Sequence, residues 1–194
     1  MATRAVIVGK GKSAIQIRRQ DHPDALLIAI NQAAFLFDEI DYLLANDIEG
    51  LYGIEEDTFR KTKNIAVPEY PHFNGWSHQD ILYTKIKDKF EAYCPNFLIY
   101  NLWTTPKKNT NLPFVDKTIS SGDTAISLFA KNFKIKKFDL YGIACGNGYN
   151  TEINKKLPND RKPFGNGWAE DRTKKLRLNI ELLKKTYDLD ININ

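Results

Sequence analysis

The fold is decided near the beginning of the chain, where residues 5–14 read A-V-I-V-G-K-G-K-S-A. The apolar run at 5–8 lacks an alternation of apolar and polar residues, which is typical of a parallel strand buried on both faces. Gly9 and Gly11 follow at once in a G-x-G-x-x-A pattern, which permits a tight turn into a short helix predicted at 12–20. Backbone N–H groups of such a turn, and the helix N-terminus behind it, favour an anion. We therefore predict a nucleotide or anion site here.

Two familiar phosphate-binding motifs can be tested by position. A P-loop requires a glycine five residues before Gly11, but Val6 stands there inside the strand, so Gly11-Lys12-Ser13 is not a Walker A motif. A dinucleotide site requires an acidic residue at the end of the second strand, where this chain has Asn31. An asparagine can bond a hydroxyl or a base but lacks the carboxylate that binds the ribose of NAD. The sequence therefore disfavours NAD.

The rest of the chain continues the alternation of apolar runs and helical stretches. Strands are predicted at 25–30, 42–45, 64–67, 97–100, 137–141 and 189–193, with helices at 80–93, 121–133 and 170–187 and a helix or turn at 33–37. This order predicts βαβ units. We expect an α/β fold, Rossmann-like and doubly wound, with a mostly parallel sheet and helices on both faces. The chain is predicted to be one domain over 1–194, with the loops at 68–80 and 145–169 as a lid.

Composition limits the class of protein. The chain has 194 residues, 42% of them hydrophobic, which suffices for a core of its own. No apolar run reaches the roughly 18 residues of a membrane-spanning helix, and the first run is too short for a signal peptide, so we expect a cytoplasmic protein. Cys94 and Cys145 are too few for a zinc site and are expected to be reduced thiols; we predict no metal or other cofactor. The net charge of +4 fits an anionic partner, a nucleotide as well as a nucleic acid.

Polar residues at other element ends extend the predicted site. Asn31 and Asn46 each follow an apolar run, and ligands of doubly wound sheets lie beyond the carboxyl ends of the strands. Both asparagines are equally suited to tight turns. Ser120, Ser121 and Gly122 open the helix at 121–133 and offer two hydroxyls and an N–H to a ligand oxygen. A serine there is also a good helix N-cap.

Several short motifs occur together along the chain. They are V-I-V-G-K-G-K-S at 6–13, I-N-Q at 30–32, I-S-S-G at 119–122, F-D-L-Y-G-I at 138–143 and K-T-Y at 185–187. Together they resemble the family 42 bacterial sialyltransferases and the related motility accessory proteins. The resemblance implies a Rossmann-like domain with a small lid, a CMP-sugar donor and transfer without an essential metal. The residues that would bind the donor nucleotide are Gly9, Lys10, Gly11, Ser13, Asn31, Asn46, Ser120, Ser121, Gly122 and, at the phosphate, Tyr149.

Three features depart from that family. Lys10 stands between the two glycines, where the family usually has asparagine, and Ala144 replaces an acidic residue after the late strand. The family's general-base histidine precedes the last helix, whereas the last histidine of this chain is His78. The predicted donor pocket therefore has more support than sialyl transfer itself.

Glycosyl transfer needs a base for the acceptor hydroxyl and a group that stabilises the leaving phosphate. The candidate bases are His72, His78 and Asp171, with Glu170 as a further carboxylate. A histidine has the near-neutral pKa that suits a base, whereas acidic residues at a helix start are also explained by the helix dipole. Lys10, Lys12 or Tyr149 could neutralise the phosphate.

We thus expect a glycosyltransferase that uses a nucleotide-sugar donor and an unknown glycan, protein or nucleic-acid acceptor, and that could form homo-oligomers. Two alternatives remain open. One is a nucleotide-binding or phosphoryl-transfer protein without glycosyl transfer. The other is a basic nucleic-acid-binding protein, which the clusters at 107–108, 161–162 and 172–175 favour.

Overall fold

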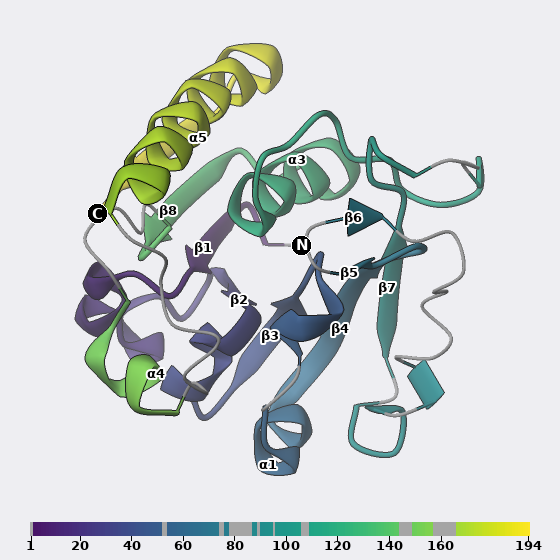
Figure 1. Cartoon of the computed structure of the whole chain (residues 1–194), viewed down its shortest axis with the longest axis vertical. Helices are drawn as coiled ribbons and strands as arrows, with labels where there is room; N and C mark the ends of the chain where they lie inside the picture. The colour runs from purple at the N-terminus through teal and green to yellow at the C-terminus, as the bar shows by residue number, and fades with distance from the viewer. Residues whose placement is uncertain are drawn as a thin grey trace.

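The structure, a computed structural model, describes residues 2–51, 54–73, 76–77, 87–88, 90–94, 96–105, 109–143, 149–156 and 166–194. Its centre is a seven-stranded sheet in the order β7-β4-β3-β2-β1-β8-β9, in which every neighbouring pair is parallel (Figure 1). This confirms the predicted Rossmann-like α/β fold. The strands are β1 (Arg4–Val8), β2 (Leu26–Ile30), β3 (Ile40–Leu44), β4 (Thr62–Pro68), β7 (Phe97–Tyr100), β8 (Lys137–Tyr141) and β9 (Asp190–Ile193).

The strand order reverses direction at β1. From β1 the chain moves outward through β2, β3 and β4 to β7, and then returns to place β8 on the other side of β1. In open parallel sheets of this kind, ligands bind beyond the carboxyl ends of the strands at the point of reversal. The loops after β1 and β8 meet at that point.

Both faces of the sheet are buried because successive strand residues enter two separate cores. In β1, Ala5 and Ile7 pack in one core, Val6 and Val8 in the other, and all four are fully buried. This explains why the strand reads as a continuous apolar run.

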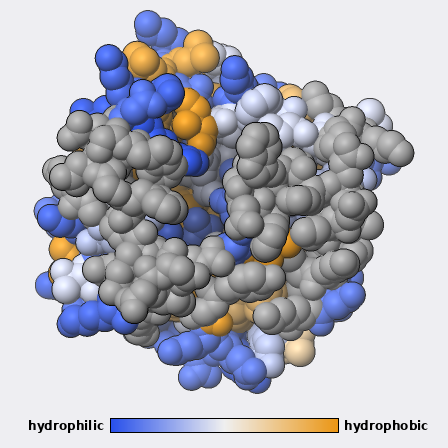
Figure 2. Space-filling model, viewed as in Figure 1, coloured by the Kyte–Doolittle hydropathy of each residue, from blue (hydrophilic) through white to orange (hydrophobic). Residues whose placement is uncertain are grey.

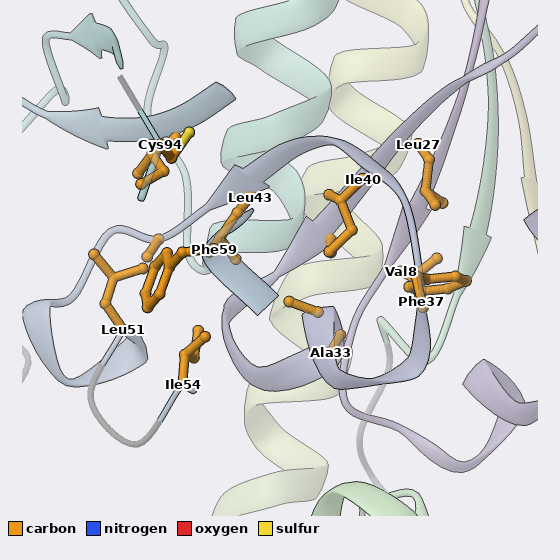
Figure 3. Close-up of a cluster of buried hydrophobic side chains, with 14 of the residues drawn as sticks. Val8, Leu27, Ala33, Phe37, Ile40, Leu43, Leu51, Ile54, Phe59 and Cys94 are labelled. Carbon is orange, nitrogen blue, oxygen red and sulfur yellow. The ribbon is translucent and has the colours of Figure 1, made fainter. Parts of the chain in front are cut away.

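Two long helices cover one face and short segments cover the other (Figure 1). The helices α3 (Ser121–Phe133) and α5 (Asn166–Tyr187) pack on the first face through residues such as Phe129 and Ile180. Figure 3 shows the second core, to which Phe37, Leu43 and Phe59 belong. The covering elements on this side are the 3₁₀ segments η1 (Lys12–Gln16), η3 (Asn31–Leu36) and η4 (Ile48–Gly50) and the helices α1 (Glu56–Arg60) and α4 (Thr151–Lys156).

Three predictions at the level of elements need correction. The helix predicted at 12–20 is only the 3₁₀ segment η1, followed by η2 (Arg19–Asp21), because the backbone is already extended at Ile17. The loop predicted at 68–80 contains a short antiparallel pair, β5 (His72–Phe73) and β6 (Trp76–Ser77). The long loop predicted after 145 contains α4, whose first N–H groups are capped by Asn150 Oδ1.

Other predictions hold or lie outside the described residues. The helix at 121–133 and the strand at 137–141 have the predicted bounds, and β9 is the predicted edge strand. Most of the helix predicted at 80–93, and parts of both loops expected to form a lid, residues 74–75, 78–80, 145–148 and 157–165, lie outside the described residues. Within the described part of the chain, no helix combines the length and the apolar character needed to cross a bilayer.

The backbones of three glycines make close contact where β1 and β8 end. Gly142 has a left-handed φ of +63°, and its carbonyl accepts a hydrogen bond from the Gly11 N–H at 2.8 Å. A Cβ atom on Gly9 would lie 2.4 Å from the Gly142 carbonyl oxygen, and one on Gly11 would lie 2.9 Å from its Cα. The glycines of the turn are therefore required by backbone packing, whatever else they do.

Replacing Gly9 with alanine should destabilise the protein by about 1–3 kcal/mol, because the new methyl group must displace a backbone carbonyl. Urea unfolding followed by circular dichroism measures the free energy. Lys12→Ala, at an exposed position in η1, is the control and should change it by less than about 0.5 kcal/mol. Equal free energies of unfolding for G9A and wild type would show that the Gly142 backbone can move away from the new methyl group without loss of stability.

Candidate functional site

Chemically active side chains gather beyond the carboxyl ends of β1, β3 and β7. Asp47 follows β3, His72 begins β5, and Thr104 lies in the turn that follows β7. The His72 backbone N–H donates to the Asn46 carbonyl at 2.8 Å, which brings β5 alongside Asp47 in a parallel bridge. Segments far apart in the sequence thus meet at one edge of the sheet.

The His72 imidazole lies between a carboxylate and a hydroxyl. Its Nδ1 is 3.7 Å from Asp47 Oδ1, and its Nε2 is 3.1 Å from Thr104 Oγ1. A carboxylate can only accept, so the favourable neutral tautomer carries its proton on Nδ1, toward Asp47. Nε2 then accepts the hydrogen bond that Thr104 donates. This arrangement has the order of groups found in enzymes that activate a hydroxyl: carboxylate, imidazole, hydroxyl.

The surroundings of the imidazole shift its pKa in favour of the neutral form. Partial burial lowers the pKa of His72, although the nearby charges of Asp47 and Glu49 act in the opposite direction. Burial raises the pKa of the Asp47 carboxyl, and the positive groups of Lys10 and Arg172 are near enough to oppose that rise. The site therefore combines a neutral base with cationic groups at the same edge of the sheet.

Asn46, predicted to bind nucleotide, holds elements together. Its Oδ1 accepts a hydrogen bond from the Tyr100 hydroxyl at 2.7 Å, and its Nδ2 donates to Thr124 Oγ1 at 2.9 Å. Its backbone N–H approaches Ser121 Oγ at 3.4 Å. Both ends of the amide thus have buried protein partners, and Asn46 fixes the chain on which Asp47 and His72 depend. A direct contact with nucleotide stays a prediction.

The glycine turn uses its own polar groups internally. The N–H of Gly9 donates to the Tyr141 carbonyl, and that of Gly11 to the Gly142 carbonyl, each at 2.8 Å. Ser13 Oγ accepts from the Gly142 N–H at 2.7 Å and donates to the Asn194 carbonyl at 2.8 Å. The amides of these two glycines and the Ser13 hydroxyl therefore serve the packing of β1 against β8, and their binding of a ligand stays a prediction.

Lys10 and Tyr149 lie together, as the predicted phosphate site requires. The Lys10 ammonium group is 4.6 Å from the centre of the Tyr149 ring. The chain around Tyr149 pairs with Gly11, and the Asn150 N–H donates to the Lys10 carbonyl at 2.7 Å. A lysine and a phenol from two distant segments are thus held beside the glycine turn.

Asn31 ends β2 in the left-handed conformation, with φ of 53°, which asparagine tolerates better than most residues. Its Oδ1 is buried and has no hydrogen-bond partner among the described residues. The same oxygen would lie 2.2 Å from a Cβ atom on Gly50, so the absence of a side chain there makes room for it. Asn31 therefore serves a tight turn, and its side-chain oxygen is a buried acceptor with no partner among the described residues.

The predicted N-cap at the start of α3 is confirmed. Ser120 Oγ accepts from the Gly122 N–H at 3.2 Å, and Asp123 accepts from the Ser120 N–H at 2.7 Å, which completes a capping box. Asp123 is fully buried, and its Oδ2 also accepts from Asn179 Nδ2 of α5 at 2.6 Å. Burial raises the pKa of Asp123 despite these donors. The turn thus joins α3 to α5; binding of a ligand by Ser120, Ser121 or Gly122 stays a prediction.

Among the other candidate bases, Asp171 is exposed on α5 and pairs with Lys175 at 2.6 Å, one helical turn away. That pairing is a surface ion pair and gives no sign of catalysis. His78 and the side chain of Glu170 lie outside the described residues.

Sequence reasoning missed Asp47, Glu49 and Thr104. Asp47 directly follows Asn46, so its place at a strand end was visible, but nothing in the sequence showed that β5 would lie beside it. Thr104 lies in a segment that reads only as a polar connection. In the described part of the chain, no three His, Cys, Asp or Glu side chains gather as they would around a metal ion.

Comparison with known proteins adds no relative: no family model, no curated protein and no solved structure matches the chain.

Tyr100→Phe should lower the free energy of unfolding by about 1–3 kcal/mol, because it leaves the buried Asn46 Oδ1 without its donor. Tyr93→Phe is the matched control, since the Tyr93 hydroxyl bonds Glu56 at an exposed site and its loss should cost less than about 0.5 kcal/mol. Thermal and urea unfolding measure both variants. Equal losses in the two would contradict the special role of the buried bond.

Proposed function

We propose that this protein transfers a glycosyl group from a nucleotide-sugar donor, of the CMP-sugar type, to a hydroxyl group of an acceptor. The observation that carries the proposal is the His72 imidazole between Asp47 and Thr104, at the carboxyl edge of a parallel sheet. Transfer to a hydroxyl needs a neutral base in contact with that hydroxyl, and Nε2 of His72 is such a group.

The charges at this edge suit the departure of a nucleotide. When the bond between sugar and phosphate breaks, negative charge grows on the leaving phosphate, and a cation fixed nearby lowers the barrier. The positive charges of Lys10 and Arg172 both act to lower the pKa of Asp47, against the larger effect of its burial. Lys10 is held against Tyr149, the residue that the family resemblance assigns to the donor phosphate.

The proposal assigns the base to a different element from the one that the resemblance implies. The chain has no histidine immediately before α5, and His72 would supply the proton acceptor from β5 instead. Asp47 would hold the tautomer and stabilise the imidazolium that forms during transfer. Asn46 would be a positioning residue, since it acts through the backbone that carries these two groups.

Calorimetric titration with CMP, UMP, CMP-N-acetylneuraminic acid and UDP-hexoses tests donor binding first. We expect at least one cytidine or uridine ligand to bind with a Kd below about 1 mM. Release of nucleotide from the bound donor, measured by chromatography, should fall by about 10²–10⁴-fold in His72→Gln while binding persists. His78→Gln is the comparison. No binding by the whole set, or loss of release in H78Q rather than H72Q, would overturn the proposal.

The pH dependence provides an independent test. Only the neutral imidazole accepts a proton, so kcat/KM for nucleotide release should be full at high pH and fall as the pH drops through the pKa of His72. Because burial lowers that pKa, the midpoint should lie below about 6.5. The Asp47 charge raises the pKa of His72, so Asp47→Asn should move the midpoint lower still. A midpoint above that of free histidine, or a shift upward in D47N, would contradict the assignment.

A nucleic-acid-binding function has one specific observation in its favour. The exposed side of α5 carries Lys174, Lys175, Arg177 and Lys185, and Figure 2 shows hydrophilic side chains there, interrupted by apolar ones. A mobility shift with DNA or RNA at low salt that disappears as salt rises would support this alternative.

A further inference from the structure

The turn that carries Thr104 is anchored on both sides of that residue. The turn that carries it is closed by a hydrogen bond from the Thr105 N–H to the Leu102 carbonyl at 3.0 Å. Leu102 is buried in the core, and the indole N–H of Trp103 donates to the Thr118 carbonyl at 3.1 Å. Both neighbours of Thr104 are thus anchored, and the threonine itself is half-buried.

The adjacent threonine shows that this contact is particular to Thr104. Thr105 is 4% exposed, and its Oγ1 has no hydrogen-bond partner among the residues that the structure describes. Two consecutive threonines therefore differ in chemistry: the Thr104 hydroxyl contacts an imidazole, and the Thr105 hydroxyl is buried with no partner in that part of the chain. An alcohol is a weak nucleophile until a base takes its proton, and only Thr104 has that base.

The position of Asp47 also favours a His72 imidazole that has taken a proton from Thr104. The imidazolium formed at His72 would lie 3.7 Å from the Asp47 carboxylate, which stabilises the positive charge. The hydroxyl in contact with Nε2 belongs to Thr104, so the base faces a hydroxyl of the protein itself.

We propose that Thr104 is a nucleophile of this site and accepts the glycosyl group, so that the protein modifies itself on Thr104 Oγ1. The inference rests on the proposed function, since the donor is a nucleotide-linked sugar. In the step, Thr104 Oγ1 forms a bond to the anomeric carbon, and the bond between that carbon and the phosphate oxygen breaks. The Thr104 proton passes to His72 Nε2 and then to solvent. The products are a glycosylated Thr104 and the free nucleotide monophosphate or diphosphate.

The test incubates the full chain with CMP-N-acetylneuraminic acid, and separately with UDP-hexoses, with no acceptor added. Intact-mass spectrometry should show the gain of one glycosyl residue per chain, and peptide mapping of the wild-type protein should place it on Thr104. Thr104→Val, which keeps the shape and removes the hydroxyl, should abolish the gain, and Thr104→Ser should retain it. Thr105→Val is the matched control and should be modified like wild type. His72→Gln should slow the gain by about 10²-fold or more.

The outcomes separate this inference from the proposed function. Nucleotide release from a donor without any gain in protein mass overturns the role of Thr104 and leaves glycosyl transfer or donor hydrolysis standing. A gain that maps to another residue, or that persists in T104V, also overturns it. Neither binding nor release with any donor overturns the proposed function, and this inference with it. Peptide mapping of the wild-type protein identifies the modified residue directly, so the test stays valid even if T104V folds poorly.

Discussion

The backbone of Gly142 occupies the space that side chains at positions 9 and 11 would fill. This contact fixes how the loop after β1 meets the loop after β8, at the place where the strand order reverses. The N–H groups of Gly9 and Gly11 bond carbonyls of residues 141 and 142. A G-x-G pattern after a first strand thus has a structural reason in this chain that does not depend on a ligand. Lys10, between the two glycines, has its ammonium group over the Tyr149 ring.

The position of the His72 backbone depends on buried polar groups around Asn46. Tyr100, Thr124 and Ser121 hold Asn46, and Asn46 holds the backbone of His72. These bonds form in a dry interior, where an unpaired amide costs free energy, so the segment has one favourable position. The geometry of the base thereby follows from the packing of β3, β7 and α3, which are elements of the core.

Much of this fold was accessible from the sequence, and the reasons are local. The continuous apolar run at 5–8 reflects a strand that is buried on both faces. Leu176, Ile180 and Leu183 recur at helical spacing and reflect a helix that is buried on one face. Both patterns can be recognised without a structure. The segment at 12–20 was misread as a longer helix because composition does not reveal where a backbone becomes extended. The pair of His72 and Asp47 could not be foreseen, since it depends on a bridge between segments that nothing in their sequence links. Asn46 was predicted to bind nucleotide, which stays a prediction, whereas its hydrogen bonds to Tyr100 and Thr124 were not predicted.

His72 is attached to the scaffold through its main chain, by the bond from its N–H to the carbonyl of residue 46. The imidazole takes no part in that main-chain bond, although its Nε2 contacts Thr104 Oγ1 at 3.1 Å. The main-chain bond at position 72 does not depend on which side chain stands there. We therefore expect that a carboxylate, a thiol or an inert side chain at this position would change the fold little. In a scaffold built this way, the chemistry of the centre can diverge by single substitutions while the sheet and its helices stay as they are.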